Sequence, residues 1–475
     1  MMRITQIELT EIGPFESAVL KFPAPAEGQR GELVIFEGPN GSGKTTIAEA
    51  IACAAIGRPR RLRPDEYQHA LSDHRSGPHP PLHHFSSRLR SGGGKVAVSI
   101  EHEGARSAVR FDSGGIAAAN ATAAMTTFVD RTIEASTSKG SSSTKLAWAV
   151  FAYQGHQRTA VITSKGPADI EAPPLFGALS FGRLDNVLAS AYFGQLLVNL
   201  DYEEAKALKE ASRSGITAER KDELERIATS RRAMLDGIER ALSEVLGREV
   251  TLEFPFEERT PRVLLDGVCI PLSLLGEGMR STLAWLADLL VRLHRVRWED
   301  PTRSPLTQDF WLILDEIDES LHPTMQMRIL PALRRLFPCA RIYLTTHSPF
   351  VVASAGEGCV FSIRPDARHQ VKGEIAAREL TPGQSLEWVV EEIFGAETGF
   401  IDAWTRDALR AHRADITRLR RKEALSEDDW RTLLERRAAL LALNEQVQTV
   451  VAMQEVPVAR ILDARLAEPP REASA

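Results

Sequence analysis

Cysteine is scarce in this sequence, and its spacing carries no chemistry. The 475 residues include four cysteines, Cys53, Cys269, Cys339 and Cys359. None of them lies in a Cys-x-x-Cys pair. The sequence therefore predicts neither a disulfide framework nor a zinc site built on paired cysteines, and the pattern is typical of a reducing compartment.

Long apolar runs and a strong excess of one charge are also absent. No uninterrupted apolar stretch approaches the roughly 18 residues that a membrane-spanning helix needs. Residues 1–13 are polar and acidic rather than basic and then apolar, so they predict no signal peptide. The formal net charge of −6 argues against a surface that coats nucleic acid everywhere, although it permits a local basic patch. We therefore expect a cytoplasmic protein without a membrane partner.

The sequence does have the composition of a folded protein, with 43% hydrophobic and 26% charged residues. Apolar residues alternate with polar ones near the start of the chain, which predicts a β-hairpin over about 4–22. A third strand is expected at 32–36, and a helix whose apolar residues share one face is expected after Lys44. The chain thus opens with the strand, glycine loop and helix that a phosphate-binding loop requires.

The loop between that strand and that helix fits the pattern G-x-x-x-x-G-K-[ST]. Glycines let backbone N–H groups converge on phosphate oxygens at a helix N-terminus, where the helix dipole favours anions. Lys44 is predicted to reach the β- and γ-phosphates of a nucleotide, and the Thr45 hydroxyl to ligate Mg²⁺. The residues expected to bind ATP here are Gly38, Pro39, Asn40, Gly41, Ser42, Gly43, Lys44, Thr45 and Thr46.

A run of five apolar residues, 310–314, ends in the adjacent carboxylates Asp315 and Glu316. Such a run predicts a central parallel strand buried on both faces, which delivers its last residues to the edge where α/β sheets bind ligands. Asp315 is expected to hold Mg²⁺ through water, and Glu316 to orient or deprotonate the attacking water. The alternative, a strand that ends in a solvated acidic turn, explains the pair only if the phosphate loop is ignored.

The apolar strand expected at 342–346 ends at His347. A lone histidine is more often structural than catalytic. Its place after the next predicted strand–helix–strand crossover favours a catalytic histidine that hydrogen-bonds the γ-phosphate.

Together, 38–45, Asp315-Glu316 and Thr346-His347-Ser348-Pro349 resemble the ABC-type ATPase head of the SMC/RecF/OLD group. The resemblance covers residues 1–56 and about 146–365, and the motifs are most similar to those of the stand-alone OLD- and RecF-related ATPases. It implies an α/β P-loop NTPase fold with a mixed sheet, a short helical arm and a helical C-terminal extension.

The resemblance also implies three further elements of the site. The signature loop that caps the nucleotide of an opposite protomer corresponds to Gly276, Glu277 and Gly278, with Gly276 where the family usually has serine. Gln154 is the candidate glutamine that contacts Mg²⁺, with Gln157 as the second choice. Asp318 matches the loop that signals between two sites.

These motifs divide the chain into four parts. Residues 1–200 are expected to form the N-terminal part of the head, with an exposed insertion at 58–94. A helical arm is expected at 201–248, the C-terminal part of the head at 249–368, and a helical region at 369–475.

Two clusters in the insertion have simpler explanations than a site. The five histidines between 69 and 84 match no zinc spacing and lie among prolines, so an irregular loop is favoured over metal binding. The arginines between 58 and 63 are explained better as a solvated flank than as a contact with DNA or a partner.

The resemblance implies an ATPase that dimerises or forms higher homo-oligomers around ATP and Mg²⁺. The leading interpretation is that it regulates a separate effector, such as a nuclease or toxin, in bacterial anti-phage defence, as the ATPase subunits of Septu and PARIS systems do. The alternative is a RecF-like DNA-repair ATPase that acts on DNA. An OLD-type nuclease would need an acidic metal-binding domain after the head, and the last hundred residues have no apolar strand ending in a DxD cluster. A transporter subunit would need a strict signature sequence and a membrane partner, and the sequence supports neither.

Overall fold

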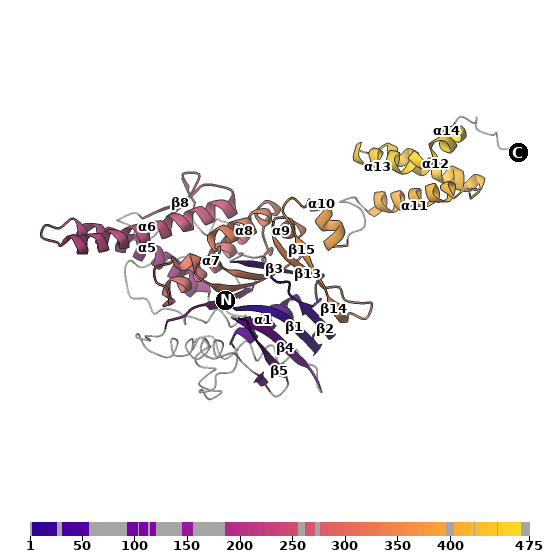
Figure 1. Ribbon diagram of the computed structural model, residues 1–475. Helices are drawn as coiled ribbons and strands as arrows, with labels where there is room; N and C mark the ends of the chain where they lie inside the picture. Colours follow the sequence, from indigo (N-terminus) through magenta and orange to yellow (C-terminus); the bar gives the residue numbers. More distant parts are fainter. Residues whose placement is uncertain are drawn as a thin grey trace. The chain divides into compact units, whose positions relative to one another are not determined.

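The computed structural model divides the chain into two compact units, Met1–Val389 and Val390–Ala475, which are described separately below (Figure 1). The structure describes residues 2–25, 31–56, 93–102, 104–112, 115–119, 145–154, 186–254, 262–270, 276–395, 403–421, 423–443 and 445–466.

The first unit is built on a six-stranded sheet in the order β15-β13-β3-β12-β11-β7. Five neighbouring strands run parallel, and β15 pairs antiparallel with β13 at one edge. Every residue of β11 and β12 is buried, as expected for parallel strands covered on both faces. The strands are β3 (Glu32–Glu37), β7 (Ala149–Gln154), β11 (Phe310–Asp315), β12 (Arg341–Thr346), β13 (Gly358–Ser362) and β15 (Ala377–Leu380).

A second six-stranded sheet contains the predicted N-terminal hairpin and has the order β14-β2-β1-β4-β5-β6. Its strands pair antiparallel except β14, which runs parallel to β2. A small sheet of β8 (Val250–Glu253), β9 (Arg262–Leu265) and β10 (Val268–Cys269) follows the arm. The second sheet comprises β1 (Met2–Ile12), β2 (Phe15–Lys21), β4 (Lys95–His102), β5 (Ala105–Asp112), β6 (Gly115–Ala119) and β14 (Val371–Ile375).

Helix α1 (Lys44–Ile56) contacts β7, β11 and β12 of the first sheet and β4 of the second. It is therefore packed between the two sheets, which explains why its described residues from Ile47 to Ala55 are buried. Helices α7 (Glu277–Arg295), α8 (Pro323–Leu336) and α9 (Pro349–Ala353) complete the unit, together with the short α10 (Leu386–Trp388). The mixed sheets and the helix that follows the glycine loop confirm the predicted α/β P-loop NTPase fold.

The helical arm is an antiparallel pair, α5 (Asn186–Ala211) and α6 (Ala218–Leu246) (Figure 1). It begins earlier than position 201, where the sequence placed it. The Thr217 hydroxyl caps the start of α6 by accepting a hydrogen bond from the Arg220 N–H. Gly247 ends that helix with φ 66°, a left-handed conformation that suits glycine. A buried apolar cluster joins the two helices near the turn and consists of Ala207, Ala211, Leu224 and Ala228.

Strands β14 and β15 lie within the range 369–475 that the sequence analysis assigned to helices. They extend the two main sheets of the first unit, so the compact part of the head continues to Val389 rather than ending at 368. The reason is that β14 has little apolar alternation: only its first residue, Val371, is buried. Its place is set by pairing with β2, more than 350 residues earlier, and no local pattern reports that contact.

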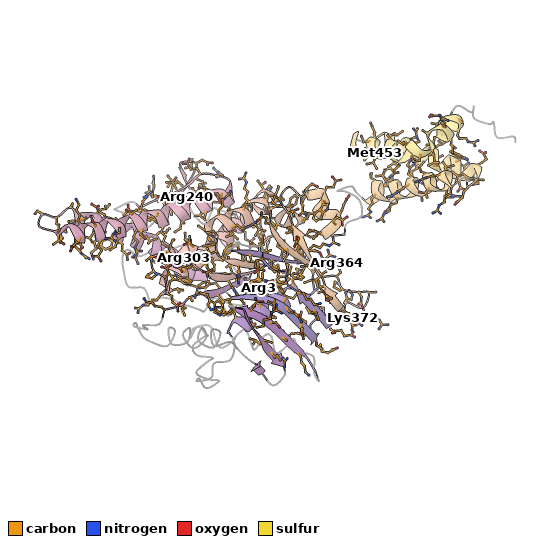
Figure 2. All side chains as sticks on the ribbon, viewed as in Figure 1. Arg3, Arg240, Arg303, Arg364, Lys372 and Met453 are labelled. Atoms are coloured by element: carbon orange, nitrogen blue, oxygen red, sulfur yellow. The ribbon has the colours of Figure 1, made fainter. Side chains whose placement is uncertain are left out.

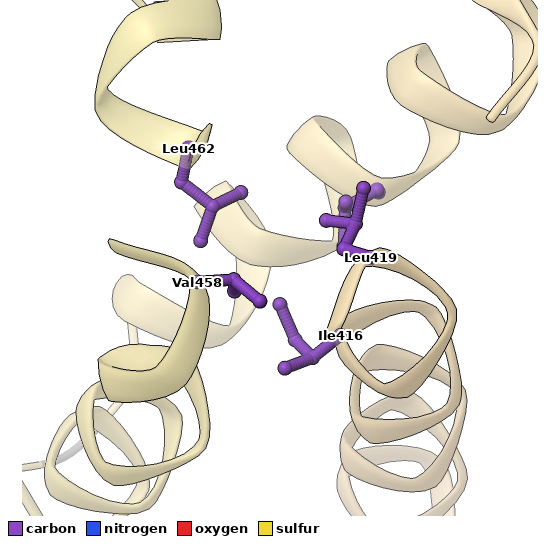
Figure 3. Packing of buried hydrophobic residues seen from close by; sticks show 5 residues of the cluster. Ile416, Leu419, Val458 and Leu462 are labelled. Atoms are coloured by element: carbon purple, nitrogen blue, oxygen red, sulfur yellow. The ribbon is translucent and has the colours of Figure 1, made fainter. Parts of the chain in front are cut away.

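The second unit is helical, with α11 (Ala403–Arg420), α12 (Glu427–Leu441), α13 (Glu445–Glu455) and α14 (Ala459–Leu466). The π-helical turn Val389–Ile393 spans its boundary with the first unit. Figure 3 shows Ile416 and Leu419 of α11 pointing toward Val458 and Leu462, and Leu433 belongs to the same buried cluster. Ser426 and Asp429 form a capping box at the start of α12. The acidic residues 427–429 therefore form the first turn of this helix.

The buried side chain of His294 on α7 predicts a pH-dependent stability. Burial lowers its pKa from 6.5 to about 4, with Arg231 adding to the effect and Glu203 opposing it. Between pH 6.5 and 4 the unfolded chain therefore binds a proton that the folded chain does not. The corresponding contribution to stability, about 3 kcal/mol, is fully present above pH 6.5 and is lost as the pH falls toward 4.

We expect His294→Asn to flatten the pH dependence of unfolding between pH 6.5 and 4.5. Urea unfolding curves measured at several pH values give the slope, and the exposed His369→Asn serves as the matched control. An unchanged slope in His294→Asn would mean that this histidine is not held neutral in the folded chain.

Candidate functional site

The glycine loop at 38–45 joins β3 to α1 and needs glycine at three positions. Gly41 and Gly43 have φ of 76° and 98°, in the left-handed region that other residues rarely adopt. A Cβ on Gly43 would lie 2.4 Å from the Phe15 ring, and one on Gly38 would lie 2.5 Å from the Ile363 carbonyl oxygen. The loop is thus closely surrounded by β2 and by the end of β13.

Lys44 begins α1 and folds back over the loop. Its Nζ donates hydrogen bonds to the carbonyl oxygens of Gly38, at 2.9 Å, and Pro39, at 3.1 Å. Burial lowers the pKa of its ammonium group, and the carboxylates of the site oppose that shift, Asp315 most strongly. The neighbouring Ser42 hydroxyl is buried and has no hydrogen-bond partner within the described part of the chain. The loop therefore offers a cation and an unpaired buried hydroxyl to a ligand.

Asp315, the last residue of β11, lies directly across from the start of α1. Its Oδ1 accepts hydrogen bonds from the Thr45 hydroxyl at 3.2 Å and from the Thr345 hydroxyl at 2.6 Å. Gln154 is the register partner of Asp315 on β7, so its backbone lies at the same edge of the sheet.

These oxygen donors fit a magnesium ion. Mg²⁺ prefers hard oxygen ligands and is commonly held by one or two carboxylates, water and the phosphates of its substrate. Thr45 and Asp315 supply one hydroxyl and one carboxylate at hydrogen-bond distance from each other. Among the described residues, no group of three or more histidine, cysteine, aspartate or glutamate side chains could hold a metal by itself. The arrangement thus suits an ion that arrives with a nucleotide.

Glu316 has a backbone conformation that is uncommon for a glutamate. Its φ is 52°, in the left-handed region that costs a non-glycine residue about 1–2 kcal/mol. The Thr345 hydroxyl fixes it in place by accepting a hydrogen bond from the Glu316 N–H at 2.8 Å. The same hydroxyl donates to the Asp315 carboxylate, so one threonine contacts both residues: the side chain of Asp315 and the backbone of Glu316.

His347 follows β12 and lies near the charged side chains of Lys44, Asp318 and Glu316. The Asp318 carboxylate accepts hydrogen bonds from the Thr346 hydroxyl, at 2.6 Å, and from the His347 N–H, at 3.3 Å. Burial lowers the pKa of the His347 imidazole below 6.5, with Lys44 adding to the shift, while Asp318 and Glu316 oppose it. The imidazole is therefore neutral at pH 7, with one nitrogen able to donate a hydrogen bond and the other able to accept one.

The residues matched to the signature loop lie at the start of α7. Gly276 and Glu277 are exposed, and Gly276 is the N-cap without a side-chain hydrogen bond. Gly278 is buried, and a Cβ there would lie 2.2 Å from the Ser320 carbonyl oxygen. The start of α7 thus packs against the loop that follows Glu316 in the same chain.

The structure brings together Lys44, Thr45, Asp315, Asp318 and His347, and it places Glu316 within the same group of charges. The side chain of Gln154 lies outside the described residues. So do Gln157, the arginines at 58–63 and the histidines at 69–84.

Sequence reasoning missed an ion pair beside the glycine loop between a buried glutamate and an exposed arginine. Glu37, the last residue of β3, is fully buried, and its Oε1 lies 2.6 Å from a terminal nitrogen of Arg364 (labelled in Figure 2). The Ile363 N–H also donates to the Glu37 carbonyl oxygen at 2.8 Å. The pair joins the residue before Gly38 to the chain after β13. Its only signal in the sequence is an acidic residue at the end of an apolar strand.

Sequence reasoning also missed Thr345, and a substitution tests its part in the site. Thr345→Val keeps the shape of the side chain but removes the hydrogen bonds to Asp315 and Glu316. Losing a partner that orients a metal ligand typically costs 10- to 100-fold in metal affinity or activity. We therefore expect the Mg²⁺ concentration for half-maximal ATP hydrolysis to rise about 10-fold or more. Mg²⁺ titrations of turnover measure this, with the exposed Thr417→Val as control; a superimposable titration would contradict the assignment.

Comparison with protein families gives two matches. The family described as "AAA domain" matches residues 6–246. A second family, whose description begins with "AAA domain" and names the AbiEii toxin and a Type IV TA system, matches residues 199–353.

Three curated proteins are similar to parts of the chain. The retron Ec83 probable ATPase of Escherichia coli is 26% identical over 140 residues, which are 29% of this chain and 24% of that protein. The retron Vc95 probable ATPase of Vibrio cholerae serotype O1 biovar El Tor is 33% identical over 100 residues, 20% of this chain and 19% of that protein. The Septu protein PtuA of Bacillus thuringiensis is 30% identical over 88 residues, 18% of this chain and 22% of that protein. The chain thus spans less than a quarter of the length of these relatives.

Solved structures of SMC heads are similar at low identity. The Smc head domain of Pyrococcus furiosus, solved with an extended coiled coil and the C-terminal domain of ScpA, is 14% identical with a TM-score of 0.39, over 80% of this chain and 97% of that chain. The SMC head domain of Thermotoga maritima is 16% identical with a TM-score of 0.35, over 80% of this chain and 99% of that chain. Within the described residues, no helix is both long and apolar enough to span a membrane.

Proposed function

Because the chain belongs to the family described as "AAA domain", which it matches over residues 6–246, we propose that it binds ATP with Mg²⁺ and hydrolyses it to ADP and phosphate. The observation that carries this proposal is the convergence of Lys44, Thr45 and Asp315 at one edge of the sheet, with Glu316 and His347 beside them. A cation, a hydroxyl–carboxylate pair and a further acid are the parts that phosphoryl transfer requires.

Each residue then has a distinct task. The loop N–H groups and Lys44 bind the triphosphate, and Thr45 and Asp315 would hold Mg²⁺. When bound, the ion neutralises charge on the phosphates. Glu316 orients the attacking water and accepts its proton, and the neutral His347 hydrogen-bonds the γ-phosphate.

Phosphate release by the purified chain tests this activity. We propose that turnover requires both ATP and Mg²⁺ and stops when EDTA removes the ion. A chain that binds ATP but releases no phosphate under any Mg²⁺ concentration would contradict the hydrolytic part and leave nucleotide binding standing.

We further propose that two chains join around ATP, with Gly276 and Glu277 of one chain facing the nucleotide of the other; Gly278, which the resemblance also included, is buried against the Ser320 carbonyl of its own chain. The exposure of Gly276 and Glu277 at the start of α7 supports this, because a surface that meets a partner must be accessible in the single chain. Light scattering of Glu316→Gln should give twice the monomer mass with ATP and Mg²⁺ and the monomer mass without them. A monomer at saturating ATP would contradict the proposal.

The likeness to the two retron ATPases and to the Septu protein PtuA supports a role in bacterial anti-phage defence, with a separate effector such as a nuclease or toxin. Cells that carry the chain with its neighbouring genes should resist phage, and Lys44→Ala or Glu316→Gln should abolish resistance. Equal resistance with these variants would contradict a defence role for the ATPase. Turnover that DNA stimulates and that falls steeply with salt would instead favour a DNA-repair ATPase.

A further inference from the structure

Two loops carry the chemistry proposed above, and one glutamine contacts both. Residues 316–321 follow β11 and contain Glu316, and residues 346–348 follow β12 and contain His347. Gln326 lies about one turn into α8, which starts directly after the first loop. None of the sequence motifs includes this residue.

The oxygen and the nitrogen of the Gln326 side-chain amide both form hydrogen bonds. Its Nε2 donates hydrogen bonds to the carbonyl oxygens of Asp318, at 3.2 Å, and Leu321, at 2.9 Å. Its Oε1 accepts a hydrogen bond from the Ser348 hydroxyl at 2.6 Å. A glutamine is the right choice here, because a single planar group must supply donors to two carbonyls and an acceptor to one hydroxyl.

Each partner of Gln326 is itself connected to the site. The Ser348 hydroxyl also caps α9 by accepting from the N–H groups of Phe350, at 3.1 Å, and Val351, at 3.4 Å. The backbone carbonyl of Asp318 accepts a hydrogen bond from Gln326. The Asp318 carboxylate accepts hydrogen bonds from the Thr346 hydroxyl and the His347 N–H. Gln326 therefore reinforces the direct link between the two loops from the side of α8.

We propose that Gln326 is a positioning residue that fixes the Glu316 loop against the His347 loop. In this position the side chains of Glu316 and His347 both face the γ-phosphate. This inference rests on the proposed ATPase function. The three side-chain hydrogen bonds of Gln326 go to Asp318, Leu321 and Ser348. A change at this residue should therefore affect the geometry of the reacting groups and not the binding of the triphosphate at 38–45. Misplacing reacting groups by about 1 Å costs on the order of 10²-fold in rate.

The first test is Gln326→Leu, which removes all three hydrogen bonds and keeps an apolar stem on α8. We expect kcat for ATP hydrolysis to fall about 10- to 100-fold, while KM and the ATP dissociation constant stay within about twofold. The control is Met327→Leu at the next, exposed position of the same helix. An unchanged kcat, or an ATP affinity that falls together with kcat, would overturn the positioning role.

The second test is Gln326→Glu, which keeps the size of the side chain and also serves if Gln326→Leu does not fold. An ionised carboxylate can still accept from Ser348 but cannot donate to the two carbonyls. Lowering the pH protonates it and restores one donor, so the activity of Gln326→Glu relative to the original chain should rise toward acid pH. The Asp318 and His347 side chains are present in both proteins, so the activity ratio removes what they contribute in common.

A flat activity ratio across the pH range would overturn the inference. The proposed ATPase function and the proposed role of Gln326 can be contradicted independently. Absence of turnover in the unsubstituted chain contradicts the ATPase function, whereas normal turnover that Gln326 variants leave unchanged contradicts this inference alone.

Discussion

Glu316→Gln is expected to lower the rate of ATP hydrolysis by about 10²- to 10⁴-fold, the range typical for removal of a general base. An amide keeps the shape of the side chain but cannot accept the proton of the attacking water. The left-handed backbone at this residue is held by the Thr345 hydroxyl through the Glu316 N–H, and the substitution leaves that bond intact. ATP affinity should therefore be retained.

Two measurements check this result. Single-turnover phosphate release gives the rate of the chemical step, and calorimetric titration gives the ATP dissociation constant. The matched control is Glu319→Gln, an exposed glutamate three positions further along the same loop. Hydrolysis at the original rate in Glu316→Gln would show that another group activates the water.

Lys44→Ala is expected to raise the ATP dissociation constant by about 10- to 100-fold. Hydrogen bonds to charged groups contribute roughly 1.5–3 kcal/mol, and each 1.4 kcal/mol corresponds to a factor of ten. The Lys44 ammonium group donates hydrogen bonds to the Gly38 and Pro39 carbonyls, which places it over the loop. The substitution removes the buried cation that we propose binds the phosphates.

Calorimetry with ATP and Mg²⁺ measures the effect, and Lys206→Ala on the exposed face of the arm is the control. Thermal unfolding without nucleotide verifies that the loop still folds. Unchanged affinity in a folded Lys44→Ala would exclude this lysine from the triphosphate site.

The parts of the fold that could be predicted from sequence are those with a strong local pattern. The run at 310–314 must be buried on both faces, and it forms the central strand β11. The glycines at 41 and 43 need left-handed backbone, and the loop they mark joins β3 to α1 as predicted. In both cases a few adjacent residues contain the whole physical reason.

The features that could not be predicted depend on contacts between distant residues. Thr345 was read only as the end of an apolar strand, yet its hydroxyl positions Asp315 and Glu316, 30 and 29 residues away. No sequence motif includes Gln326, yet its side chain bonds Asp318, Leu321 and Ser348. The partner of Glu37, Arg364, lies 327 residues further along the chain. Hydrogen bonds of this kind leave no periodicity in the sequence.

The most direct test of the central claim is an experimental structure of Glu316→Gln with ATP and Mg²⁺. We predict that residues 38–45 surround the triphosphate, that Thr45 and Asp315 lie at the ion, and that Glu316→Gln and His347 face the γ-phosphate. A nucleotide bound elsewhere on the chain, or a triphosphate whose terminal phosphate lies far from positions 315, 316 and 347, would contradict the account.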